Sequence, residues 1–166
     1  ITNSVTRLEL DNNSRISLSN NLDANTANTV FGKSAWNIAS TSTNNASDQN
    51  VCIGELAMGT GTIAGASDNI AVGYRGLEDI TSGDGNVALG SYAGSSITTG
   101  SSNVAIGGYD GVTNGAMKAN VSASQCVAVG TGALAGVTTQ NGTVAIGHTA
   151  LTALTSGAGN TAVGYQ

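Results

Sequence analysis

Asn86-Val87-Ala88-Leu89-Gly90 is followed further along the chain by the closely similar Asn103-Val104-Ala105-Ile106-Gly107. Variants of this five-residue pattern recur along most of the chain. Its glycine falls at positions 32, 54, 73, 90, 107, 130, 147 and 164, so that successive intervals are 22, 19, 17, 17, 23, 17 and 17. The basic period is therefore 17, and three copies are lengthened by insertions of 5, 2 and 6. A fixed period of this kind predicts a repeat architecture, in which each unit buries its apolar face by stacking on its neighbours.

Two columns of the pattern predict a β-strand. The residue three before the glycine is β-branched in every copy, and the residue just before the glycine is apolar in every copy. β-Branched residues favour the pleated strand, and positions two apart lie on one face of it. We therefore expect these columns, represented by Val87 and Leu89 in one copy, to form the core of the repeat.

The column between them is small and apolar. A strand face in contact with water would carry polar side chains, so this column predicts that the second face is buried as well, against a close neighbour. The apolar side chains of one chain are few for a sequence so rich in glycine, which predicts a closed homo-oligomer. The residues expected to pack between chains are Ala71, Ala88, Ala105, Ala128, Ala145 and Ala162.

The glycine and asparagine columns predict turns at the two ends of the strand. The glycine indicates a backbone corner with a positive φ or a close approach. Asparagine suits the preceding turn, because its side chain bonds backbone groups and stacks in ladders. This column contains Asn28, Asn50, Asn69, Asn86, Asn103 and Asn160, with Cys126 and Thr143 in its other two places. The second half of each repeat has apolar residues three apart, as in Leu77 and Ile80, which predicts either a helical turn or a short second strand.

These columns together predict an all-β fold, a β-solenoid or parallel β-roll with coils of about 17 residues stacked about 4.8 Å apart. We assign residues 23–166 to this solenoid, as about eight coils with the last one truncated. Residues 1–22 alternate polar and apolar residues around the turn Asp11-Asn12-Asn13-Ser14, and we assign them to an N-terminal hairpin or adaptor.

The composition excludes several classes of protein. The 166 residues include 24 Gly and no Pro, and only 9% are charged, which argues against a compact enzyme-like fold. The 40% apolar content argues against disorder. A net charge of −5 excludes a basic surface for nucleic acid or an anionic membrane, and no apolar run is long enough to span a bilayer. The chain opens at Ile1 without a signal peptide, and we expect it to be part of a longer protein.

The repeated motifs carry a family resemblance. Asn86 to Gly90, with Tyr92-Ala93-Gly94 and Ile97-Thr98-Thr99-Gly100 after it, resembles the repeats of bacteriophage tail fibres, as does Asn160 to Gln166. Val104 to Gly107 and Val144 to Gly147 are similar to the core of the head repeats of trimeric autotransporter adhesins. The resemblance covers roughly residues 28–166 and implies an elongated trimer of parallel β-rolls that recognises a host. The longer repeat unit and its uneven insertions depart from the adhesin pattern.

Few residues suggest chemistry. The single His148 stands in a variable column after the glycine, which predicts a surface position and no catalytic triad. Cys52 and Cys126 form no metal motif and lie four coils apart, roughly 19 Å at the strand spacing, which excludes a disulfide within the chain. The glycine-rich stretches lack the Lys-Ser/Thr of a phosphate loop. We expect no enzyme activity, no cofactor and no metal.

A pair of carboxylates for sugar cleavage is the one catalytic alternative. Its candidates are Glu78 with Asp79, or Asp84 or Asp110 from a neighbouring chain. Solvated surface charge is the simpler interpretation of these residues.

Recognition of a receptor by surface residues is the remaining function that the sequence suggests. The candidate receptor contacts follow the repeat glycine by one or two residues and include rings suited to stacking on sugars: Tyr74, Arg75, Tyr92, Tyr109, His148 and Tyr165. The alternative is that the tyrosines cover neighbouring coils or chains. The inserted loops, expected at residues 38–49, 59–68 and 113–125, are further contact candidates, and Trp36 beside the first is expected to cap the core.

We expect a homotrimeric tail-fibre segment, a stiff spacer or tip in host attachment. Its partners would be a glycan or outer-membrane component of a bacterial surface and the other domains of the same fibre chain. Unpaired cysteines favour assembly in a reducing cytoplasm, followed by residence in the virion. The alternatives are a bacterial trimeric surface adhesin, a glycan-cleaving tail spike and an ice-binding solenoid. The last would need a flat Thr-x-Thr face, whereas Thr98-Thr99 and Thr138-Thr139 are adjacent pairs.

Overall fold

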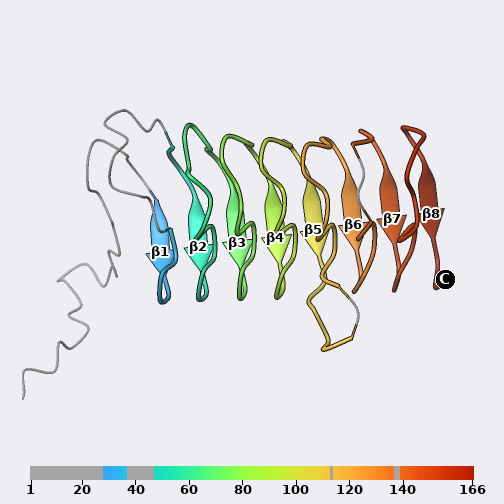
Figure 1. Cartoon of the computed structure of the whole chain (residues 1–166), viewed down its shortest axis with the longest axis horizontal. Coiled ribbons are helices and arrows are strands. Elements are labelled where there is room, and N and C mark those ends of the chain that lie inside the picture. The colour runs from blue at the N-terminus through green and yellow to red at the C-terminus, as the bar shows by residue number, and fades with distance from the viewer. Residues whose placement is uncertain (1–27, 37–46, 113, 137–138) are drawn as a thin grey trace, which may run out of the picture.

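Eight three-residue strands form one parallel sheet in a computed structural model that describes residues 28–36, 47–112, 114–136 and 139–166 (Figure 1). Each strand pairs with the next along the chain, and each residue pairs with its counterpart in the repeat, as Ala88 does with Ala105. The strands are β1 (Thr29–Phe31), β2 (Val51–Ile53), β3 (Ile70–Val72), β4 (Val87–Leu89), β5 (Val104–Ile106), β6 (Val127–Val129), β7 (Val144–Ile146) and β8 (Thr161–Val163). The predicted β-solenoid is confirmed. The predicted adaptor at residues 1–22 lies outside the described residues.

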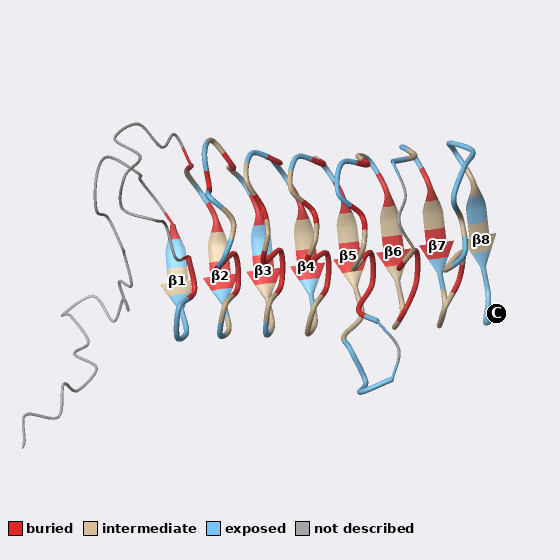
Figure 2. Ribbon diagram, viewed as in Figure 1, coloured by how far each residue is buried: buried red, intermediate tan, exposed pale blue. Residues whose placement is uncertain are grey.

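The two faces of the strand are the reverse of the sequence prediction. The middle residue points into the coil, and Ala71, Ala88, Ala105, Ala128 and Ala145 are at most 1% exposed in a single chain. The flanking columns face outward, so Ile53 and Leu89 are 38% and 37% exposed (Figure 2). The alanine side chains, half-buried Ala162 of the last strand apart, therefore have no surface with which to pack between chains. The assignment of the large aliphatic columns to the core was also wrong.

The core lies inside the coils and is narrow. Most coils contribute the small strand residue, a second small residue three after the glycine, and then a larger residue at the next position, where the coil of β4 has Gly94 instead. In the third coil the last two are Gly76 and Leu77, and Ile80 completes the set. Trp36 takes the place of Leu77 in the first described coil and is 3% exposed, as expected for a side chain that closes the core. A coil this short leaves room for little more, so volume selects alanine for the strand position.

The glycine corner has both properties that its column predicts. Gly73 has a φ of +131°, and a Cβ there would lie 2.7 Å from the backbone of Gly90 in the next coil. Gly90 itself has a φ of +122°. Only glycine adopts this conformation at low cost and also lets two backbones approach so closely. The corner therefore permits successive coils to stack at the spacing of paired strands.

A buried ladder of asparagine side chains runs along the start of the strands. The Oδ1 of each asparagine accepts the backbone N–H and the Nδ2–H of the next one, as Asn69 Oδ1 does from Asn86 at 2.9 and 3.0 Å. The remaining Nδ2–H of Asn86 is donated to the Gly100 carbonyl at 2.9 Å. The ladder includes Asn28, Asn50, Asn69, Asn86 and Asn103, and it ends at the backbone N–H of Cys126. It satisfies polar groups that the narrow core would otherwise bury without partners.

The residues two positions before the asparagine column form a second ladder of hydrogen bonds. There the N–H of one coil is donated to a side-chain oxygen of the next, as from Ser67 to Asp84 and from Asp84 to Ser101 at 2.8 and 3.0 Å. This second ladder follows the edge at which the strands begin, opposite the edge formed by the glycine corners (Figure 1). It engages Asp48, Ser67, Asp84, Ser101, Ser124 and Asn141.

The second half of each coil consists of turns and bends. Within the described residues it contains neither a helix nor a second strand, which answers the alternative that periodicity left open. Backbone hydrogen bonds to the next coil hold it instead, as Leu77 N–H to the Ala93 carbonyl at 3.1 Å and Asp79 N–H to that of Ser95 at 3.0 Å.

The six-residue insertion lies earlier than the predicted 113–125. Ala116 N–H bonds the Gly107 carbonyl at 3.0 Å, just as Ala93 N–H bonds that of Gly90 at 3.2 Å. The extra residues therefore lie between Gly107 and Ala116, where a loop projects beside β5 (Figure 1). The insertion at 59–68 is confirmed near its start, where Thr60 and Gly61 both bond the Glu78 carbonyl. Most of the insertion at 38–49 lies outside the described residues.

Candidate recognition edge

Three tyrosines of successive coils meet at the edge where the strands end. Tyr74 and Tyr92 have ring centroids 5.4 Å apart, and Tyr92 and Tyr109 have theirs 5.7 Å apart, both pairs in edge-to-face geometry. The backbone fixes this arrangement, because Tyr92 N–H bonds the Tyr74 carbonyl at 2.8 Å and Tyr109 N–H bonds that of Ser91 at 2.9 Å. The three rings therefore pack against one another across neighbouring coils at this edge, and their role as receptor contacts stays a prediction.

Two cations lie over these rings. The Arg75 guanidinium is 5.2 Å from the Tyr74 centroid and 5.7 Å from that of Tyr92. The Lys118 ammonium is 5.3 Å from the Tyr92 centroid and 6.0 Å from that of Tyr109. Each lies within the range of a cation–π interaction. We call these five residues the tyrosine–cation cluster.

The two cations differ in their polar partners. Arg75 forms an ion pair with Glu78 at 3.3 Å, and its Nε–H is donated to the Tyr74 hydroxyl at 2.9 Å. Lys118 donates to the neutral Asn114 Oδ1 at 3.2 Å, and it forms no ion pair with a carboxylate in the described part of the chain. Lys118 is thus the cation whose charge is not compensated locally.

Burial shifts the pKa of two groups at this edge. It raises the pKa of the Glu78 carboxyl, an effect that the charge of Arg75 opposes and that of nearby Asp79 reinforces. Burial also raises the pKa of the Tyr92 hydroxyl, which stays a neutral phenol at physiological pH. The cluster therefore keeps its positive charge against neutral rings.

The structure does not bring all the sequence candidates together. His148 and Tyr165 form a separate stacked pair, with centroids 5.2 Å apart and planes within 10°. They belong to the coils of β7 and β8, and Thr131 occupies the equivalent corner of the coil between them and the cluster. His148 is half-buried beside the Thr149 hydroxyl.

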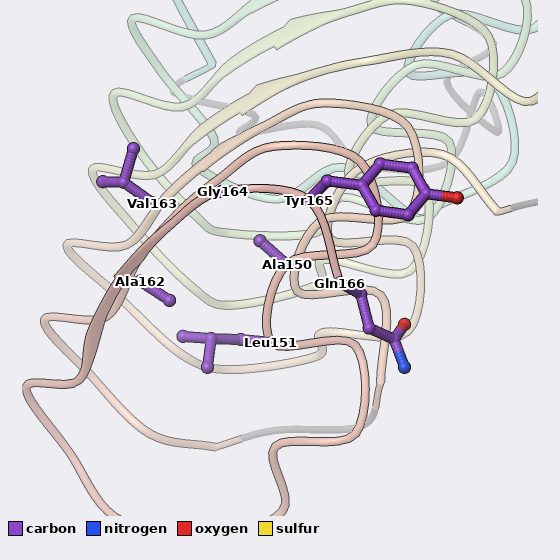
Figure 3. A pocket seen from close by; sticks show the side chains of 7 residues that line it. All are labelled: Ala150, Leu151, Ala162, Val163, Gly164, Tyr165 and Gln166. Atoms are coloured by element: carbon purple, nitrogen blue, oxygen red, sulfur yellow. The ribbon is translucent and has the colours of Figure 1, made fainter.

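An open hollow lies beneath Tyr165 at the end of the stack. Ala150, Leu151 and Ala162 point into the last coil, whereas Val163 and Tyr165 point away from it (Figure 3). Gly164 and Gln166 complete its lining. The hollow is therefore the interior of the last coil, and it repeats the orientation of small residues inward and large residues outward.

Lys118 is the residue of the edge that sequence reasoning missed. It follows the tyrosines only once the insertion is placed before Ala116, which puts Lys118 at the position of Ser95 in the preceding coil. Aligning Ala116 with Ala93, in place of the mismatched Asp110, is the signal that locates it.

Apart from the adjacent Glu78 and Asp79, the carboxylates of the catalytic alternative lie apart from one another within the chain. Asp79 accepts a hydrogen bond from the Thr60 hydroxyl, Asp84 lies at the opposite edge, and Asp110 accepts the N–H of Val112. In the described ranges, no three His, Cys, Asp or Glu residues gather in a way that would hold a metal ion. Neither do these ranges include an apolar helix of membrane-spanning length.

Both cysteines are buried and free. The Cys52 thiol packs 3.2 Å from the Met58 sulfur, and burial raises its pKa to about 12, so that it stays protonated and unreactive. Cys126 takes a place in the asparagine ladder.

Comparison with known proteins gives no relative: no family model, curated protein or solved structure matches the chain.

Proposed function

We propose that this chain is a stiff segment of a homotrimeric bacteriophage tail fibre that takes part in attachment to a bacterial surface. The proposal rests mainly on the outward face of the sheet, which is formed by the first and last residues of β1 to β8. None of these sixteen residues is charged, and fourteen are apolar. Phe31, Ile53, Ile70, Leu89, Ile146 and Val163 are each more than a third exposed in the single chain.

A continuous apolar strip of this kind favours association. Eight strands at about 4.8 Å spacing make it roughly 34 Å long. Large exposed apolar patches mark contact surfaces between proteins. Second and third copies of the chain suit the strip, because three identical strips facing a common axis cover one another and close the assembly. The number three comes from the resemblance to tail-fibre and adhesin repeats.

The same arrangement supports an attachment role. With the sheet face turned toward the axis, the glycine corners and the tyrosine–cation cluster stay at an outer edge, and three copies of that edge are presented together. Three weak sites on one rigid body bind a repetitive surface far more tightly than one site does. The free, buried cysteines support assembly in a reducing cytoplasm before incorporation into the virion.

The test replaces the apolar strip while keeping the strands. The double substitution Leu89→Thr and Ile106→Thr places β-branched residues at two outward positions and removes their apolar ends. We expect a folded monomer with reduced adsorption to bacterial cells that the wild-type protein binds. The control Ser82→Thr with Ser122→Thr alters two exposed residues outside the strands and is expected to change neither mass nor adsorption. A double variant that keeps the wild-type mass and adsorption would contradict the proposal.

A further inference from the structure

We infer that the tyrosine–cation cluster binds an anionic saccharide, whose acidic group lies between Arg75 and Lys118 and whose ring packs beside the exposed tyrosines. This inference rests on the proposed function and deepens it by naming the chemical class of the receptor.

The geometry of the cluster supports the placement of the acidic group near Arg75 and Lys118. Arg75 and Lys118 come from different coils yet lie 5.7 and 5.3 Å from the centroid of one ring, that of Tyr92. The two charges are therefore no further apart than the sum of these two distances. The solenoid thus holds two cations near one ring, so that an acidic group beside that ring lies in the field of both charges.

The distribution of charged side chains also supports the binding of an anion at this cluster. The chain carries a net charge of −5, but Asp48 and Asp84 lie in the second ladder at the opposite edge. At the cluster, Glu78 offsets Arg75, and the ammonium of Lys118 has only a neutral partner. Asp79 also lies near Glu78, so the cluster together with these two carboxylates carries no excess positive charge, and Lys118 is the cation that an anion reaches without displacing an ion-pair partner.

The exposed rings favour a sugar as the carrier of that anion. Tyr74 and Tyr109 are 38% and 43% exposed and flank the covered ring of Tyr92. A tyrosine offers an apolar ring and a polar hydroxyl, which match the C–H face and the hydroxyl groups of a pyranose. Val112, at 90% exposure in the inserted loop, adds apolar surface to the coil of Tyr109 and Lys118. An open edge with repeated rings suits a chain of sugars laid along it.

Substitutions of Glu78 and Lys118 test the inference, because they are expected to change the affinity for an anion in opposite directions. Glu78→Gln removes the carboxylate that offsets Arg75 and keeps the shape of the side chain, so anion binding becomes tighter. Lys118→Met removes the uncompensated charge and keeps the aliphatic stem, so binding becomes weaker. General damage to the fold would weaken binding in both variants.

The experiment is a calorimetric titration of the full chain at low salt. The probes are trigalacturonic acid, its methyl ester and phosphorylated maltotriose, which separate a carboxylate from a neutral sugar and from a phosphate. We expect binding of at least one acidic probe and none of the ester. For that acidic probe, we expect at least tenfold weaker binding by Lys118→Met and several-fold tighter binding by Glu78→Gln. Lys33→Met is the matched control, because it removes a cation that is paired with Glu55 and lies in the coil of β1, two coils away from β3, and it is expected to match the wild type.

Several results would overturn the inference. They are equal binding of the acid and its ester, no binding of any probe, tighter binding of single-stranded DNA than of the acidic sugars, or a loss of affinity in Glu78→Gln. Its failure is separable from that of the proposed function, because the cluster belongs to a single chain. A trimer that adsorbs to cells without any effect of Lys118→Met overturns the inference alone. A monomer that binds trigalacturonate through Lys118 overturns the trimeric fibre alone.

Discussion

Volume at a single position governs how these coils close. Ala88 is fully buried within its coil, whereas its neighbour Leu89 is 37% exposed on the outward face. We expect Ala88→Leu to destabilise the chain by about 1–3 kcal/mol, because the coil has no room for three extra carbon atoms. Leu89→Thr is expected to cost less in a dissociated chain. Urea unfolding of both variants, monitored by circular dichroism, measures the difference, and equal stability of Ala88→Leu and wild type would contradict the inward placement.

Two glycines of the corner column distinguish conformational strain from a steric clash between coils. Gly73 and Gly164 have φ values of +131° and +143°, but a Cβ would contact the next coil only at Gly73. Gly164→Ala therefore introduces conformational strain alone, about 1–3 kcal/mol. Gly73→Ala adds a clash with the backbone of Gly90, and we expect a distinctly larger loss of thermal stability. Equal melting temperatures for the two variants would show that close approach does not set the corner.

Among the elements, the asparagine ladder links successive coils from β1 to β6. Asn86 donates to Asn69 and Gly100 and accepts from Asn103, all of them buried. Asn86→Ala removes the acceptor of the Asn103 N–H groups and the donor to the Gly100 carbonyl, whereas Asn69 Oδ1 still accepts the backbone N–H of residue 86. We expect a total loss of about 1–3 kcal/mol. Hydrogen exchange of the Asn103 amide reports the change directly. Unaltered protection of that amide would contradict a structural role for the ladder.

The asparagine ladder is interrupted at Cys126, where we expect a substitution to increase the stability of the chain. Cys126 receives the bond from Asn103 through its backbone, and its thiol lies near the carbonyls of Ser124 and Gln140, at 3.4 and 3.2 Å. An asparagine there would donate to Asn103 and Gln140 as its counterparts do. We expect Cys126→Asn to stabilise the chain by about 0.5–1.5 kcal/mol, measured by urea unfolding. A loss of stability would mean that the ladder geometry does not continue past Asn103.

The strands themselves show what sequence can and cannot predict. The columns located β4 at Val87–Leu89 and the glycine corner after it, because β-branched residues and glycine have strong backbone preferences. The direction of the faces was not predictable from alternation, since both faces are apolar. Size decides it: only a residue as small as Ala88 fits inside a coil this narrow. Lys118 escaped prediction because an insertion displaced it from the repeat.

At the scale of the whole molecule, the exposed apolar face is the feature that a single chain leaves unsatisfied. The interior of the coils is complete without a partner, since Ala71, Leu77 and Ile80 are fully buried in one chain. What a partner would cover is the outward strip that includes Ile53, Leu89 and Ile146. We therefore expect assembly to depend on the large aliphatic columns, with the small column inside each chain.

The mass of the protein in solution tests this account most directly. Light scattering after size exclusion, repeated over a range of concentrations, gives the number of chains in the assembly. We predict a mass three times the 16.2 kDa of one chain, unchanged by Lys118→Met and reduced to one chain by Leu89→Thr with Ile106→Thr. A wild-type mass of one chain at every concentration would contradict the account, because the apolar face would then be stable in water without a partner.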